Sequence, residues 1–209
     1  TGRLVNSCER RNTVSGPKRN LERRTELLEI CFDTFCKNGL ENTGMKKLAD
    51  ACGVSNGALI YYFESKDNIV IASTAHCMAK VEDDFMAKAP TSFADIERFL
   101  REMPYLTAKL HGEKYRFMYQ VYASPRYREY GKEFFRGVNV RYHQYAELLS
   151  GKLGMPTDYI QGMIYIFVRA CVHYALFEDE NYLQLQLSAI RASLEAYIKG
   201  KYIKGRTQL

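Results

Sequence analysis

Apolar residues recur every three or four positions along most of the chain, which is the period of an amphipathic α-helix. We find no convincing two-residue alternation of the kind that marks β-strands. Prolines and glycines such as Pro104, Gly112 and Gly154 divide the helical pattern into pieces. We expect about nine helices, near residues 20–38, 65–88, 92–109, 114–123, 126–150, 157–178 and 181–199, with two short ones between 43 and 64. The predicted fold class is therefore all-α.

The segment 43–66 has the pattern of a helix-turn-helix. The apolar face of its first helix comprises Met45, Leu48, Ala49 and Cys52. Gly53 follows where that helix must stop, because glycine adopts the left-handed conformation without a steric penalty. Ser55 or Asn56 can then cap a second short helix, on which Leu59 points back to the first. A helix held in this way fits the major groove of DNA.

The sequence GVSNGALIYYFESK resembles the signature of the TetR family of bacterial one-component transcriptional regulators. The similarity extends upstream through ELLEICFDTFCKNGLENTGMKKLADACGV, which starts at Glu26. The resemblance implies a DNA-binding domain at residues 20–66 and a ligand-binding and dimerisation domain at 67–209. The basic residues 1–19 are expected to be disordered, either as an arm that grazes DNA or as an extension left from expression.

The resemblance places the DNA contacts on the second motif helix and beside it. The expected contacts are Lys46, Lys47, Ser55, Asn56, Gly57, Ile60, Tyr61, Tyr62 and Lys66. Lys66 opens the next helix, where its ammonium and the helix dipole can together hold a phosphate. Gly44, Ala58 and Ile60 depart from residues frequent in the family, although Ile60 can still touch a thymine methyl. The alternative is a motif retained without DNA binding.

The last two long helices carry more apolar residues than one face needs. The predicted dimer interface comprises Ile164, Val168, Val172, Leu187, Ile190 and Leu194. The resemblance implies that two copies pair these helices as a four-helix bundle with twofold symmetry. The alternative is that the same residues are buried within one chain.

Aromatic residues on the middle helices, with two polar residues on the most apolar helix, suggest an effector pocket. The candidates are Tyr115, Met118, Tyr119, Tyr122, Phe135, Tyr142, Arg169 and His173. The aromatic residues could equally be plain core. Arg169, expected to be buried, is either an anchor for a ligand or the partner of an internal carboxylate or another subunit. The expected effector is medium-sized and largely hydrophobic or aromatic.

A net charge of +6 and a pI near 8.9 permit binding to a polyanion. The apolar stretch 159–177 is interrupted by Gln161, Arg169 and His173, so we expect a buried helix, no membrane partner and a cytoplasmic protein. We see no catalytic motif, cofactor signature or metal-ligand spacing. The prediction is a homodimeric repressor that binds double-stranded DNA at a palindromic operator and is released by a small-molecule effector. The rival is an architectural or protein-interaction protein on the same fold.

Overall fold

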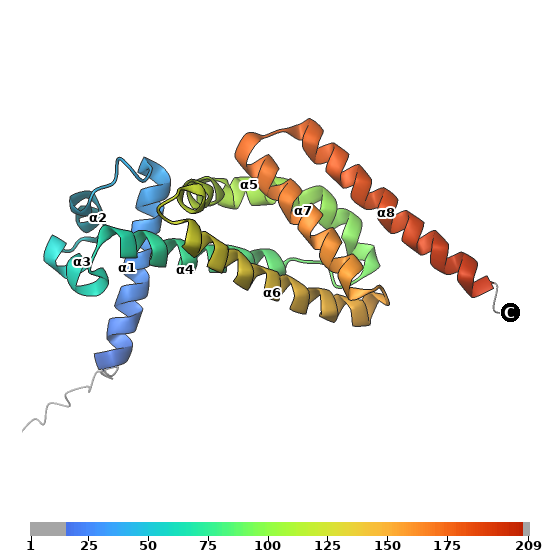
Figure 1. The fold of residues 1–209 in the computed structure, drawn as a ribbon, viewed down its shortest axis with the longest axis horizontal. Coiled ribbons are helices and arrows are strands. Elements are labelled where there is room, and N and C mark those ends of the chain that lie inside the picture. The colour runs from blue at the N-terminus through green and yellow to red at the C-terminus, as the bar shows by residue number, and fades with distance from the viewer. Residues whose placement is uncertain (1–15, 207–209) are drawn as a thin grey trace, which may run out of the picture.

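A computed structural model describes the backbone of residues 16–206 and the side chains of residues 20–200. It contains eight α-helices in these residues and confirms the all-α fold class. In chain order they are α1 (Gly16–Asn38), α2 (Met45–Cys52), α3 (Asn56–Phe63), α4 (Lys66–Ala87), α5 (Phe93–Ala123), α6 (Arg128–Leu153), α7 (Thr157–Phe177) and α8 (Glu180–Arg206). Figure 1 shows α1–α3 at one end of an elongated molecule, with α4 leading from them to the remaining helices. Of the segment 1–19 that was expected to be disordered, residues 16–19 instead belong to α1, and residues 1–15 lie outside the described residues.

The helix-turn-helix is confirmed in its local chemistry. Gly53 has the left-handed φ of 62°, and its N–H donates to the carbonyl of Asp50 at the end of α2. Ser55, rather than Asn56, is the N-cap of α3, because its Oγ accepts the backbone N–H of Ala58 at 3.1 Å. Gly44 supplies no side-chain cap to α2. The backbone of the motif therefore follows from residues that lie next to one another in sequence.

The prediction of separate helices at 92–109 and 114–123 is wrong, because α5 runs unbroken through Pro104 and Gly112. Pro104 is buried within the helix, where packing outweighs its missing N–H. A Cβ at Gly112 would lie 3.3 Å from the carbonyl oxygen of Ala175, so α5 and α7 approach closely at this point. Gly112 is thus a packing residue and does not end a helix.

α6 likewise continues through Gly131 and Gly137, and the two glycines differ in their surroundings. We expect Gly131→Ala to destabilise the fold by about 1–3 kcal/mol, since overpacking a close helix crossing forces neighbours apart. Its added Cβ would lie 2.7 Å from Cβ of Tyr122 and 3.2 Å from the Tyr122 carbonyl oxygen on α5. Gly137→Ala is the matched control: nothing lies within 4 Å of its Cβ, so it should stabilise by about 0.5–1 kcal/mol. Urea unfolding measures both, and a neutral Gly131→Ala would contradict the close crossing.

α7 is long and apolar enough to cross a membrane by length and composition alone. In the fold it packs against α5, α6 and α8 and buries Phe167, Ala170 and Cys171. This packing is that of a core helix in a helical bundle, in agreement with the buried helix expected from sequence.

Candidate DNA-binding surface and effector cavity

The outward face of α3 presents four of the predicted DNA contacts. Asn56 and Gly57 at its first turn are exposed, as are Ile60 and Tyr61 one turn later. Ile60 is 52% exposed and Tyr61 75% exposed, although both are large and apolar. The opposite face of α3 buries Leu59 in the core to which α1, α2 and α4 also contribute. A short helix fixed on one side and free on the other can enter a groove with its N-terminal residues first.

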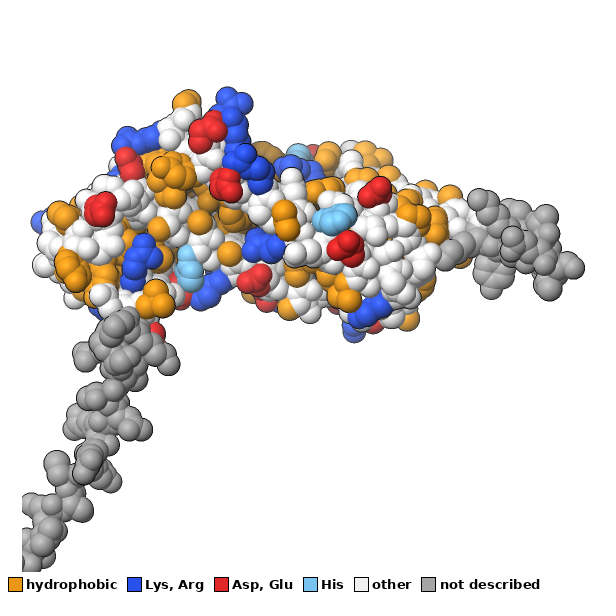
Figure 2. Space-filling model, turned by 60° about the horizontal axis from the view of Figure 1, so that its bottom comes forward, with side chains coloured by type: hydrophobic (Ala, Val, Ile, Leu, Met, Phe, Trp, Pro, Cys, Tyr) orange, Lys and Arg blue, Asp and Glu red, His pale blue; other side chains and the backbone are white. Residues whose placement is uncertain are grey.

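The other predicted contacts on the motif, apart from Lys46, also have structural partners. Ser55 is the cap of α3, and Tyr62 is half-buried against the core, with its ring centroid 5.4 Å from that of Tyr61. Lys47 donates to Oδ1 of Asn38 at 3.2 Å, whereas Lys46 is simply exposed. On the face seen in Figure 2, positive, negative and hydrophobic side chains are interspersed. Because charges of both signs are mixed on this face, the candidate DNA-binding surface is identified by the helix-turn-helix motif and not by surface charge.

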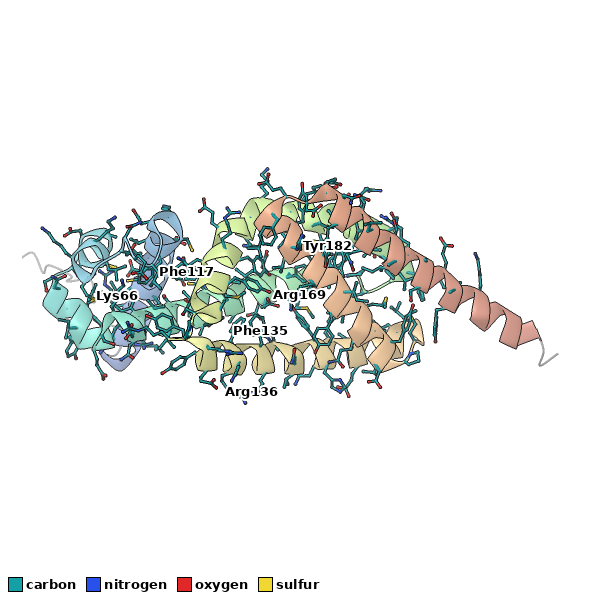
Figure 3. The ribbon with its side chains drawn as sticks, turned by 45° about the horizontal axis from the view of Figure 1, so that its top comes forward. Lys66, Phe117, Phe135, Arg136, Arg169 and Tyr182 are labelled. Atoms are coloured by element: carbon teal, nitrogen blue, oxygen red, sulfur yellow. The ribbon has the colours of Figure 1, made fainter. Side chains whose placement is uncertain are left out.

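Lys66 lies at the start of α4, as predicted, but its ammonium is already engaged. Nζ donates to the carbonyl oxygen of Leu40 at 2.8 Å and so ties the loop between α1 and α2 to α4. Figure 3 shows Lys66 within the N-terminal helices, away from Arg169 in the other half of the molecule. A lysine ammonium has three donors, so Lys66 can hold this carbonyl and still offer an N–H to a phosphate.

Asp67, next along α4, joins the DNA-binding motif to the turn between α5 and α6. Its Oδ1 accepts the Tyr127 hydroxyl at 2.6 Å, and its Oδ2 accepts a hydrogen bond from Arg126. The Tyr127 hydrogen bond, followed by the Arg126 hydrogen bond and charge, lowers the pKa of Asp67 below its ordinary value of 3.8. We call these three residues the Asp67 latch. Sequence reasoning missed it because its partners lie far apart in the chain.

Six of the eight predicted effector-site residues line one cavity of about 80 Å³ between α4, α5, α6 and α7. They are Tyr115, Met118, Tyr119, Phe135, Tyr142 and Arg169. We call this space the polar cavity. Figure 3 shows Arg169 on α7 and Phe135 on α6 in the middle of the C-terminal helices. The sequence pattern thus placed residues from three helices around one space, and their role as an effector site stays a prediction.

The polar cavity contains a carboxyl group that sequence reasoning missed. Glu82 of α4 is 5% exposed, and its Oε2 accepts the Tyr142 hydroxyl at 2.7 Å. Burial raises the pKa of Glu82 above its ordinary 4.5, while the Tyr142 hydrogen bond and the charge of Arg141 oppose this change. The signal was present in the sequence, because Glu82 lies on the apolar stripe of α4 between Met78 and Phe85.

Arg169 departs from the expected burial. It is exposed at the edge of the polar cavity, and its Nη1 donates to the hydroxyl of Tyr119 at 2.6 Å. Tyr119 is therefore its partner, in place of the internal carboxylate that the sequence left open. Because one N–H is used by Tyr119, the guanidinium keeps further donors for a ligand.

Two predicted residues lie outside the polar cavity. Tyr122 is buried one turn further along the same face of α5, where its ring packs against those of Phe134 and Phe135. His173 turns towards α8, with its ring centroid 4.0 Å from that of Tyr182 and Nε2 3.6 Å from Asp179. It shares a face of α7 with Arg169 but contacts different helices, so sequence spacing alone could not separate their surroundings.

The predicted dimer residues are largely used within the chain. Val172, Leu187 and Ile190 are buried in its own core, and Val168 lines the polar cavity. Ile164 and Leu194 are half-buried. The large apolar residues on the outer surface of the last two helices are instead Tyr165, Ile166, Phe177, Leu185 and Ile198. The excess apolar surface exists, but on positions that the residue pattern could not distinguish from the inner face.

The chain thus has a helix-turn-helix whose second helix is free on one side, and α4 joins this motif to a helical body with an internal cavity. This arrangement is typical of helical DNA-binding regulators. Residues 28–72 match the sequence model described as bacterial regulatory proteins, tetR family. This match covers α2, α3 and the adjoining parts of α1 and α4, so the helix-turn-helix region of the chain is similar to that of tetR-family regulators. The HTH-type transcriptional repressor KstR2 of Rhodococcus jostii is 44% identical over 48 residues, which is 23% of this chain and 24% of that protein. The chain thus spans about a quarter of the length of the curated relatives it matches.

Solved structures extend the likeness in fold beyond the motif. A TetR transcription regulator from Haloarcula marismortui superposes with a TM-score of 0.66 at 14% identity, covering 84% of this chain and 98% of that one. The multidrug binding protein EbrR, complexed with malachite green, superposes with a TM-score of 0.54 at 14% identity, covering 82% and 97%. At such identities the likeness concerns the fold, and it includes the C-terminal helices that the sequence match leaves out.

Proposed function

We propose that the chain is a homodimeric, cytoplasmic transcriptional repressor that binds a palindromic operator through α3 and leaves it when an effector enters the C-terminal helices. The exposed face of α3 carries this proposal. Ile60 and Tyr61 are large, apolar and more than half exposed on a helix whose opposite side is packed. Such residues are suited to thymine methyls and sugar edges in a major groove.

Dimerisation is supported by the exposed apolar residues of α7 and α8, among them Ile166, Phe177 and Leu185. At Gly162 on α7 no atom lies within 4 Å of the position that a Cβ would take, so a partner helix could approach closely there. Two recognition helices must be held about 34 Å apart to reach successive major grooves on one side of the duplex. A twofold pair of these helices would supply that fixed spacing.

Effector sensing is supported over a purely architectural role by the polar cavity and by the path from it to the motif. α4 carries Glu82 in the cavity and Asp67 at the motif, about 22 Å apart along a helix that rises ~1.5 Å per residue. The turn bearing Arg126 and Tyr127 joins α5 to α6, and both helices line the cavity. An effector that shifts α6 against α5 would therefore act on the Asp67 latch. EbrR, which holds malachite green, offers a precedent on this fold.

Selection of bound duplexes from a random pool tests the DNA-binding part of the proposal. Enriched sequences should be palindromic, with half-site centres about one helical turn apart. Light scattering at the protein concentration used for selection should report a dimer. A pool without enrichment, or binding by a monomer to a single half-site, would count against this reading and favour the interaction protein.

The Asp67 latch gives a separate prediction. Tyr127→Phe removes only the hydroxyl that Asp67 accepts, and it should lower the free energy of unfolding by about 1–2 kcal/mol. Because the folded-state pKa of Asp67 is lowered, this contribution is present above the ordinary value of 3.8 and is lost as the pH falls below it. Urea unfolding between pH 7 and pH 3 should show the variant and wild type converging at acid pH. Tyr130→Phe, on an exposed residue of α6, is the control and should change little.

A further inference from the structure

A second cavity lies beside the polar cavity, at the opposite end of α4 from the DNA-binding motif. Its volume is about 100 Å³, and helices α4 to α8 all contribute to it. Representative lining residues are Phe85, Phe99, Leu149, Met163 and Ile190. We call it the apolar cavity.

The chemistry of the apolar cavity is nearly uniform. Tyr145 and Tyr159 are the only lining residues with a polar side-chain group. The Tyr145 hydroxyl donates to the carbonyl oxygen of Pro90 at 3.0 Å, and the Tyr159 hydroxyl pairs with Oγ of Ser193 at 2.7 Å. Both hydroxyls are thus satisfied by the protein itself. A pocket lined in this way favours apolar groups, because it offers a polar group no hydrogen-bond partner.

The two cavities follow the same helices. Val168 on α7 lines both of them. On α4 the lining passes from Glu82 to Phe85, and on α6 from Tyr142 to Tyr145. Each of these steps is three residues, or about 5 Å along a helix. The two spaces therefore adjoin one another along α4, α6 and α7.

The polar groups gather at one end of this combined space. Arg169 stands at the exposed edge of the polar cavity with free N–H donors, whereas Glu82 is buried and already accepts the Tyr142 hydroxyl. Burial favours the neutral form of a carboxyl, so the guanidinium is the dominant charge facing a ligand. An anionic oxygen group fits such a donor best, by paired N–H hydrogen bonds.

We propose that the two cavities together bind one amphipathic anion, whose slim hydrocarbon chain fills the apolar cavity and whose carboxylate lies against Arg169. This inference rests on the proposed effector-binding function and narrows it to a ligand class. Compact polar effectors such as sugars are disfavoured, because the apolar cavity offers them no hydrogen-bond partner. Cationic amphiphiles are disfavoured by Arg169.

Calorimetric titration of the full chain with straight-chain probes tests the proposal. The probes are hexanoate to dodecanoate, with decanol and decyltrimethylammonium as neutral and cationic counterparts of decanoate. Each added methylene should tighten carboxylate binding about threefold to fourfold until the cavity is full. Decanoate should bind at least about tenfold more tightly than decyltrimethylammonium. Equal or tighter binding of the cation, or affinity independent of chain length, would overturn the assignment.

Two variants separate the two ends of the site. Arg169→Met should weaken decanoate about tenfold or more and leave decanol unchanged. Arg136→Met is the matched control, on an exposed residue at the outer side of α6 in Figure 3, and should leave both unchanged. Met163→Trp fills the apolar cavity and should weaken the longest chains most, and Met86→Trp repeats this test from α4 if the first variant does not fold. If both cavity variants still bound decanoate as the wild type does, the apolar half of the site would be rejected.

The same titrations keep this inference distinct from the proposed function. If the protein bound its selected operator but none of the carboxylates, the proposed ligand class would be rejected and the DNA-binding proposal would stand. If decanoate bound with the expected dependence on Arg169 but did not release operator DNA, the proposed ligand site would stand and the proposed effector sensing would be rejected. Release by decanoate, abolished in Arg169→Met, would support both.

Discussion

Replacing Phe117 by alanine is expected to lower the free energy of unfolding by about 3–5 kcal/mol, the usual cost of removing a buried phenyl ring. Phe117 of α5 is 3% exposed. Its ring stacks on that of Phe35 at 5.4 Å between centroids and meets Phe32 edge-on at 5.6 Å, both from α1. Figure 3 shows Phe117 where the N-terminal helices meet the C-terminal ones. The substitution therefore removes the centre of the contact between the two parts of the chain.

Leu110→Ala is the control on the same helix, because Leu110 is 47% exposed. It should change stability by less than about 0.5 kcal/mol. Urea unfolding followed by circular dichroism measures both variants. A loss below about 1 kcal/mol for Phe117→Ala would mean that the aromatic cluster repacks and that α1 and α5 are less firmly joined than the structure indicates.

Asn56→Ala should weaken binding to the selected operator about thirtyfold or more, and should change which base is preferred. Ser55 caps α3, which leaves the exposed Asn56 amide free for a base edge. A bidentate amide contact discriminates by about 1–3 kcal/mol, and a twofold dimer makes it twice. Binding to unrelated DNA should be unchanged, since no phosphate contact is removed.

Gln144→Ala, on an exposed residue of α6, serves as the matched control and should not affect DNA binding. Gel-shift titrations with the selected operator and with single-base variants measure the effect. If Asn56→Ala weakened binding to all sequences alike, Asn56 would contact the DNA backbone. The proposed orientation of α3 in the major groove would then be wrong.

The sequence predicted the helix-turn-helix well because its determinants are local. Gly53 ends α2, Ser55 caps α3, and Leu59 points inward at helical spacing, all within seven residues. The polar cavity was also partly predictable, since the aromatic residues of α5 and α6 share helix faces that pack together.

What failed depended on tertiary contacts. Gly112 resembled a helix stop, but it lies within a continuous helix, where a Cβ would come within 3.3 Å of the carbonyl oxygen of Ala175. Leu187 and Ile190 resembled an interface, because periodicity gives an apolar face without saying which neighbour covers it. Glu82 was missed although it stands on an apolar stripe of α4, and its partner Tyr142, 60 positions away in the sequence, could not be predicted from spacing.

The position of Arg169 on an exposed turn of α7 has a kinetic consequence. Arg169 and Tyr165 line the polar cavity, and their neighbour Ile166 belongs to the exposed apolar surface proposed for dimerisation. A partner subunit seated on that surface would stand across the route by which a ligand leaves. The residence time of the effector would then lengthen with protein concentration, because a monomer releases its ligand freely while a dimer must first open.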